Sequence, residues 1–169
     1  TVCSAKKQKN TVHSQRFEFT QQLKKAIPEL AIFGHGVQPI DDKADAIDTF
    51  KYHVVIENVS HKNHWSEKLA DAFLGHAMPF YYGCTNLHEY FPCNSYIAID
   101  PYDIERSIQT VKESIRSGAY EKHQNEISEA RKLVLHKYNF FSTVADIIQK
   151  NLQSDYAKRH EPTLIKSRR

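Results

Sequence analysis

The sequence predicts an α/β fold, a Rossmann-like three-layer domain in which a mostly parallel sheet lies between two layers of helices. Apolar segments of strand type alternate with segments of helical type along the chain, and residues 53–56 form a nearly continuous β-branched run. Alternating strands and helices favour parallel pairing with right-handed crossovers. A continuous apolar run is typical of a strand that is covered on both faces. We therefore expect helices on both sides of one sheet.

Two strands and one helix are expected ahead of that run. The segments are residues 1–4 (strand), 17–26 (helix), 30–33 (strand) and 41–50 (a loop with a short helix). The helix has apolar residues at steps of four and three, and Pro28 follows its end. Gly34 and Gly36 would allow a ligand to approach the backbone closely, but a plain turn is the preferred interpretation.

The same alternation continues after the central strand. Helices are expected at residues 66–76 and 103–116, strands at 80–82 and 96–99, and two further helices between residues 121 and 152, parted near Asn139. The helix at 103–116 is the best defined, because its apolar residues follow steps of four, three and four and Asp103 is a suitable N-cap. No internal repeat interrupts this order.

The length of 169 residues suits a single domain with its own hydrophobic core. We assign residues 1–157 to this domain and residues 158–169 to a basic C-terminal tail. The tail carries five cations and little apolar sequence, so a solvated terminus is the preferred interpretation. Association with an anionic membrane surface is the alternative, although stable anchoring usually needs a second signal.

The composition argues against several classes of protein. Apolar residues make up 40% and charged residues 25%, as in soluble globular domains, and no run of 18 apolar residues is present. Three cysteines without C-x-x-C spacing favour a reducing compartment, so we expect a cytoplasmic protein, and no apolar leader indicates a signal peptide. A net charge of +3 is too small and too evenly spread to indicate a nucleic-acid partner.

Polar residues follow the central strand and open the next helix. Glu57 and Asn58 end the strand, and the triplet of Ser66, Glu67 and Lys68 begins the helix. Ligands of parallel sheets bind outside the carboxyl ends of the strands. Free backbone N–H groups and the helix dipole favour an anion at a helix N-terminus, and a lysine adds a mobile point charge. This order predicts a phosphate or diphosphate site.

Common nucleotide and metal motifs are missing from the sequence. No G-x-G-x-x-G follows a strand, and no Walker lysine motif is present, so the usual dinucleotide and nucleoside-triphosphate interpretations lose support. His61 and His64 have H-x-x-H spacing without an evident third ligand. The sequence also lacks a D-x-D motif, which would hold a diphosphate through a divalent metal. We therefore expect neither a metal site nor an obligatory cofactor.

Several motifs together carry a resemblance to a known family. In order and spacing they are Ile56-Glu-Asn58, His64-Trp-Ser-Glu-Lys-Leu69, Pro79-Phe-Tyr-Tyr-Gly83, Phe91-Pro92 and Ser95-Tyr-Ile-Ala-Ile-Asp100, with Arg16 and Tyr52 upstream. They resemble F-E-N, Y-x-T-E-K-L, P-V/I-x-x-G and F-x-P-x-S-F-I-x-V-x-D of the α1,3-fucosyltransferases, glycosyltransferase family 10. The resemblance covers nearly the whole chain and implies the C-terminal, donor-binding half of a GT-B glycosyltransferase.

The resemblance implies that the donor GDP-fucose binds at these residues. Glu67 falls where a carboxylate accepts hydrogen bonds from the ribose, and Lys68 and Arg16 fall where cations meet the diphosphate and nucleotide. A charge-assisted hydrogen bond to phosphate contributes about 1.5–3 kcal/mol. The other donor-binding residues expected from the motifs are Asn58, His64, Ser66 and Tyr82.

Some of these positions keep two interpretations. Asn58 either bonds neighbouring backbone at the strand end or holds the donor loop. Tyr81 and Tyr82 alternate across a strand, so one is expected in the core and the other at the cleft. His64 stands where the family more often has tyrosine, and the pattern assigns no role to Glu57.

The activity that the resemblance implies is inverting transfer of fucose from GDP-fucose to a hydroxyl of a glycan acceptor, either lipopolysaccharide or an oligosaccharide. In the family's two-domain plan, the acceptor site and its general base belong to an N-terminal half that is not in these 169 residues. No catalytic residue is therefore assigned, and this chain alone is expected to bind nucleotide but transfer little sugar. The alternatives are a related transferase that uses another nucleotide sugar and a non-catalytic, doubly wound nucleotide-binding module.

Overall fold

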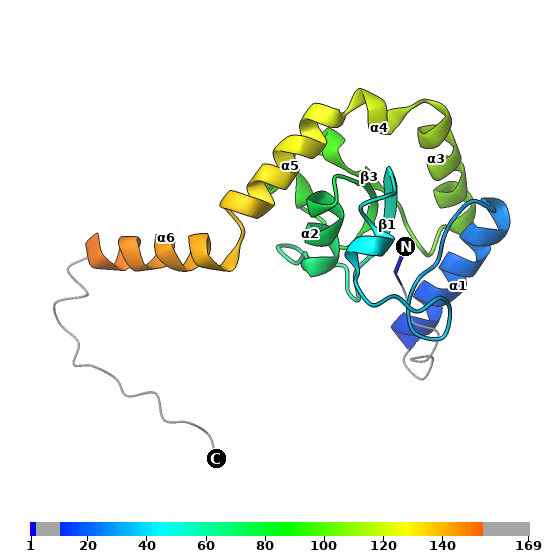
Figure 1. Ribbon diagram of the computed structural model, residues 1–169, viewed down its shortest axis with the longest axis horizontal. Coiled ribbons are helices and arrows are strands. Elements are labelled where there is room, and N and C mark those ends of the chain that lie inside the picture. Colours follow the sequence, from blue (N-terminus) through cyan, green and yellow to red (C-terminus); the bar gives the residue numbers. More distant parts are fainter. Residues whose placement is uncertain (3–10, 154–169) are drawn as a thin grey trace, which may run out of the picture.

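The computed structural model describes residues 1–2 and 11–153 of the chain. Its sheet has three parallel strands in the order β1-β2-β3, namely β1 (Tyr52–Ile56), β2 (Met78–Tyr82) and β3 (Ile97–Ala98) (Figure 1). The register pairs Tyr52 with Met78 along β1 and β2, and Phe80 with Ile97 along β2 and β3. The structure confirms the parallel α/β fold expected from the sequence.

Helices cover both faces of the sheet. On one side lie α1 (Thr11–Ala26) and α3 (Ile104–Arg116), and on the other lie α2 (Glu67–Leu74) and α5 (Gln124–His136) (Figure 1). The short α4 (Ala119–Lys122) links α3 to α5, and α6 (Phe140–Gln153) follows α5. Short 3₁₀ turns lie at Ala44–Ala46, Leu87–Glu89 and Cys93–Ser95. The three layers agree with the predicted architecture.

The β-branched run of β1 serves two cores because successive strand residues face opposite sides of a sheet. Val55 packs with Leu69 and Phe73 of α2 and with Ala130 of α5. Each of those three helical residues is fully buried. Burial of a leucine or phenylalanine side chain stabilises a fold by about 1.5–3 kcal/mol. This core fixes α2 against the sheet.

The opposite face of the sheet packs against the first and third helices. Val54 and Ile56 of β1 contact a cluster that includes Phe19 and Leu23 of α1 and Val111 of α3. Phe19 and Leu23 are buried because they lie four residues apart and so share one side of α1. This core holds α1, and with it the polar residues of its first half, beside the end of β1.

Several predicted boundaries differ from the structure. Among the described residues near the N-terminus, Val2 forms only an isolated parallel bridge with Phe33, so neither 1–4 nor 30–33 is a full strand there; residues 3–4 lie outside the described part. Helix α1 begins at Thr11, six residues before the expected start at residue 17. The strand expected at 96–99 is reduced to Ile97–Ala98. The break near Asn139 and the N-cap at Asp103 are confirmed.

Helix α6 extends away from the three layers (Figure 1). Its apolar side chains are largely exposed: Phe140, Phe141, Ile147, Ile148 and Leu152. Within the described residues, no helix combines the length and apolar character needed to cross a bilayer. The basic tail at 158–169 lies outside the described residues.

Candidate functional site

The polar residues that end β1 meet the first turn of α2 at the carboxyl edge of the sheet. The Glu57 N–H donates to the Tyr82 carbonyl at 2.9 Å, which extends the pairing of β1 and β2 by one residue. Ser66 caps α2 and adopts an extended backbone, while its hydroxyl accepts a hydrogen bond from the Lys68 N–H at 3.3 Å. The strand end and the helix start are therefore held at adjacent positions.

The loop between β1 and α2 is held in place by side-chain contacts with later segments of the chain. The amides of Asn63 and Asn86 pair, because the Asn63 N–H donates to Asn86 Oδ1 at 2.8 Å and Asn86 Nδ2 donates to Asn63 Oδ1 at 2.7 Å. Trp65 packs edge-on against Phe91 and Tyr138, with ring centroids 5.1 and 5.5 Å away. These contacts anchor the residue immediately before Ser66.

Glu57 is the most buried charged group of the site, with 1% of its surface exposed. Its Oε1 accepts hydrogen bonds from the Ser66 N–H at 2.9 Å and from the Ser66 hydroxyl at 2.8 Å, and Oε2 lies 2.7 Å from the same hydroxyl. The Lys68 ammonium donates to Oε2 at 3.1 Å. Burial of a carboxylate is costly unless it is paired and hydrogen-bonded, and these donors supply both conditions.

Lys68 lies between two carboxylates. Besides Glu57, its Nζ contacts the Ser66 hydroxyl at 3.0 Å and Glu67 Oε1 at 3.4 Å. The Glu67 side chain is 67% exposed, whereas that of Lys68 is 28% exposed. Partial burial acts to raise the pKa of the Glu67 carboxyl, but its own backbone N–H and the Lys68 ammonium outweigh this and hold that pKa below its usual value.

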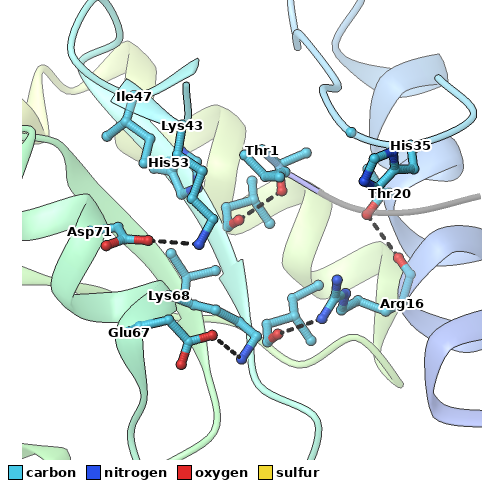
Figure 2. Close-up of a pocket in the computed structure, with 15 residues that line it drawn as sticks. Thr1, Arg16, Thr20, His35, Lys43, Ile47, His53, Glu67, Lys68 and Asp71 are labelled. Carbon is cyan, nitrogen blue, oxygen red and sulfur yellow. Dashed lines mark hydrogen bonds and ion pairs between the residues drawn. The ribbon is translucent and has the colours of Figure 1, made fainter. Parts of the chain in front are cut away.

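Arg16 reaches the same place from the other side of the sheet. Its Nη1 donates to the Ile56 carbonyl at 3.4 Å and to Asn58 Oδ1 at 3.3 Å. Figure 2 shows Arg16 of α1 and Lys68 of α2 at the end of β1, on opposite sides of the strand. Two cations from separate helices therefore lie near the carboxyl end of the central strand, one on each side of it.

A cavity of about 200 Å³ runs beside β1 and is lined by Arg16, Glu67 and Lys68 (Figure 2). Farther along its wall, Lys43 and Asp71 form an ion pair at 2.8 Å. A smaller cavity of about 50 Å³ adjoins the ends of β1 and β2, and its walls include Asn58, Tyr82 and Tyr102. Arg16 and Ile56 line both cavities.

The aromatic pair that ends β2, Tyr81 and Tyr82, divides as expected. Tyr81 is buried in the core, and its hydroxyl accepts a hydrogen bond from the Cys84 N–H at 2.9 Å. Tyr82 is half-buried in the smaller cavity and contacts Tyr102, with ring centroids 6.0 Å apart. Burial raises the pKa of the Tyr82 hydroxyl, so it stays a neutral hydrogen-bonding group at physiological pH.

The structure brings together most of the residues predicted for donor binding. Arg16, Glu67 and Lys68 line the larger cavity, while Asn58 and Tyr82 line the smaller one. Asn58 accepts a hydrogen bond from Arg16, a role that neither earlier interpretation included. By contrast, His64 is exposed and lines neither of these two cavities.

The backbone N–H groups at the start of α2 differ from the expectation for a phosphate site. The sequence predicted free N–H groups at the start of α2, but the Ser66 N–H is bound to Glu57 and the Lys68 N–H to the Ser66 hydroxyl. The chain's own carboxylate thus occupies the helix terminus. The sequence analysis assigned no role to Glu57, because residue type alone does not reveal burial. The sequence feature that could have indicated its role is a carboxylate directly after a buried strand, followed by a serine N-cap and a lysine.

His53 is buried beside the larger cavity, and its Nδ1 has no hydrogen-bond partner. Burial lowers the pKa of the imidazole to about 3, with smaller contributions from the N-terminal ammonium and Lys43. The ring is therefore neutral at physiological pH. In the part of the chain that the structure describes, no three His, Cys, Asp or Glu side chains are grouped closely enough to hold a metal ion.

Comparison with known proteins identifies the family. A sequence model described as "Glycosyltransferase family 10 (fucosyltransferase) C-term" matches residues 1–144. The chain belongs to glycosyltransferase family 10. Among curated members, 4-galactosyl-N-acetylglucosaminide 3-alpha-L-fucosyltransferase 9 of Homo sapiens is 26% identical over 171 residues, and that of Mus musculus is 25% identical. Each match covers 95% of this chain and 44% of the relative, so the chain spans less than half the length of these relatives.

Solved structures of the family share the fold. An alpha1,3-fucosyltransferase with GDP-fucose superposes with a TM-score of 0.62 at 17% identity, over 91% of this chain and 47% of that one. A second structure, of alpha1,3-fucosyltransferase, gives 0.61 at 17% identity over 96% of this chain and 47% of that one. The family 10 chain therefore has the fold of about half of these enzymes.

Proposed function

We propose that this chain is the donor-binding half of a fucosyltransferase that transfers fucose from GDP-fucose to a hydroxyl of a glycan acceptor. Membership of family 10 supports this proposal, and a structural neighbour was solved with GDP-fucose. The observation that carries it is the meeting of Arg16 and Lys68 beside one cavity at the carboxyl end of β1. Two cations next to an exposed carboxylate suit a nucleoside diphosphate, which has both phosphates and a ribose.

Each group has a definite task in this proposal. Lys68 and Arg16 bind the diphosphate and stabilise the negative charge that GDP gains as it leaves, while Glu67 accepts hydrogen bonds from the ribose hydroxyls. An acceptor oxygen forms a bond to the anomeric carbon as the bond from that carbon to the phosphate oxygen breaks. The proton of the acceptor goes to a general base, and the reaction inverts the configuration. The base and the acceptor site belong to the remainder of the enzyme, and lipopolysaccharide or an oligosaccharide is the acceptor.

Calorimetric titration of GDP and GDP-fucose into the wild type and Lys68→Ala tests the donor site. The loss of one charge-assisted hydrogen bond predicts a Kd at least about ten-fold higher in the variant. Lys62→Ala is the matched control, because Lys62 is an exposed lysine of the preceding loop and should leave the affinity unchanged. Equal affinity of Lys68→Ala and wild type for both ligands would contradict the assignment of Lys68.

A panel of donors separates this proposal from a related transferase. Titration of UDP and of GDP linked to other sugars should give weaker binding than GDP-fucose. A preference for UDP would contradict a guanine-nucleotide site. A preference for GDP bearing a different sugar would keep the nucleotide assignment and replace fucose.

A further inference from the structure

Glu57 is the most buried carboxylate at the site, with only 1% of its surface exposed, whereas the Glu67 side chain is 67% exposed. We propose that Glu57 is a positioning residue for diphosphate binding: it holds the Lys68 ammonium and the first turn of α2 in the geometry that receives the donor. This inference rests on the proposed function. It assigns Glu57 no contact with the ligand, since Glu57 acts through Lys68 and Ser66.

The directions of the lysine's hydrogen bonds support this role. An ammonium group has three N–H donors. Two of them have partners that are partly or fully buried, namely Glu57 Oε2 at 3.1 Å and the Ser66 hydroxyl at 3.0 Å. The third points toward Glu67, whose side chain is exposed and whose oxygen is 3.4 Å away. A phosphate oxygen can therefore replace Glu67 at the third position, while Glu57 and Ser66 keep the ammonium in place.

Charge also distinguishes the two carboxylates. Lys68 and Arg16 together carry two positive charges, and Glu57 and Glu67 carry two negative charges, so the site has no large excess of either sign. Displacement of the solvated Glu67 costs little, because exposed ion pairs contribute only about 0–1 kcal/mol. Separation of Lys68 from the buried Glu57 would leave an unpaired charge in the protein interior. The diphosphate is therefore expected to bind Lys68 without breaking the contact with Glu57.

Close packing fixes Glu57 on its other side. A Cβ atom added to Gly83 would lie 2.5 Å from Glu57 Cγ and 2.8 Å from Glu57 Cβ. The absence of a side chain at Gly83 thus lets the β2 end pack directly against Glu57. Held between Gly83 and the start of α2, the carboxylate has little freedom to move, which a positioning residue requires.

The variant Glu57→Gln tests the inference, because it keeps the size of the side chain and removes its charge. We expect the Kd for GDP to rise about ten-fold, whereas the Kd for guanosine, which has no phosphate, should change less than about two-fold. In the Lys68→Ala background, Glu57→Gln should cause no further loss of GDP affinity. The matched control is Glu105→Gln, an exposed carboxylate of α3, which should bind GDP like the wild type.

Three results would overturn the inference. They are wild-type GDP affinity in Glu57→Gln, an equal loss for GDP and guanosine, and an undiminished loss in the Lys68→Ala background. If GDP binds the wild type and Lys68→Ala weakens that binding, these results reject only the positioning role of Glu57. If the wild type binds neither GDP nor guanosine, the proposed donor-binding function is itself rejected. Thermal unfolding must confirm that Glu57→Gln is folded. If it is not, Glu57→Asp keeps the charge but shortens the reach, and an unchanged GDP affinity in that variant also overturns the inference.

Discussion

The neutral imidazole of His53 makes the stability of the fold depend on pH. His53 is 6% exposed, and burial, followed by the N-terminal ammonium and Lys43, lowers its pKa to about 3 in the folded chain. In the unfolded chain the pKa of histidine is about 6.5. At a pH between these two values, His53 binds a proton in the unfolded chain but not in the folded chain. Its neutral form in the fold therefore contributes fully to the free energy of unfolding above pH 6.5, and this contribution is lost as the pH falls from 6.5 toward 3.

The size of the effect follows from the two pKa values. Between pH 7 and pH 5, proton binding to the unfolded chain at this one residue lowers the free energy of unfolding by about 2 kcal/mol. The phenylalanine variant His53→Phe removes the titrating group and keeps a ring of similar size. We therefore expect the wild type to lose about 2 kcal/mol more than His53→Phe over this pH range.

Urea unfolding followed by circular dichroism at pH 7, 6 and 5 measures this difference. The control is His88→Gln, at an exposed histidine, measured over the same pH range. Parallel pH dependences for wild type and His53→Phe would refute the reasoning. An NMR titration of the wild type gives a second measurement, and a His53 pKa near 6.5 would refute it as well.

Two further predictions concern single residues that fix the site and the sheet. Gly83→Ala should lower the free energy of unfolding by about 1–3 kcal/mol through overpacking, because the added Cβ would lie 2.5 Å from Glu57 Cγ and 2.6 Å from Tyr81 Oη. Chemical denaturation measures this difference, and an unchanged unfolding midpoint would contradict the packing argument. Asp103→Ala should lower the free energy of unfolding by about 1 kcal/mol, because the Asp103 side chain accepts the Arg106 N–H at 3.3 Å as the N-cap of α3, whereas Asp103→Asn should keep most of that stability.

The sheet and its covering helices could be predicted because their residues carry regular patterns. The strand at 53–56 was evident from its β-branched run, and α3 from its apolar spacing and N-cap. Helix α1 was predicted too short, since its first turns are polar and show no apolar period. Residues 30–33 read as a strand from apolar character alone, but strand formation also needs a paired neighbour, and among the described residues only Phe33 has one.

The candidate site was predicted through its exposed and half-exposed groups. Arg16, Glu67 and Lys68 were identified from motifs, and the structure brings them to one cavity. Glu57 escaped prediction because its role depends on burial and on Gly83, which lies far along the sequence at the end of a different strand. Contacts between separate elements of this kind cannot be read from local spacing.

The position of Trp65 gives the protein a built-in optical probe. It is the only tryptophan of the sequence, and it directly precedes the serine that caps α2. Its ring packs against Phe91 and Tyr138, which come from segments far along the chain. Tryptophan fluorescence therefore reports on the local structure at the start of α2, whereas circular dichroism averages over all helices. A ligand that reshapes the start of α2 should change the emission without any label.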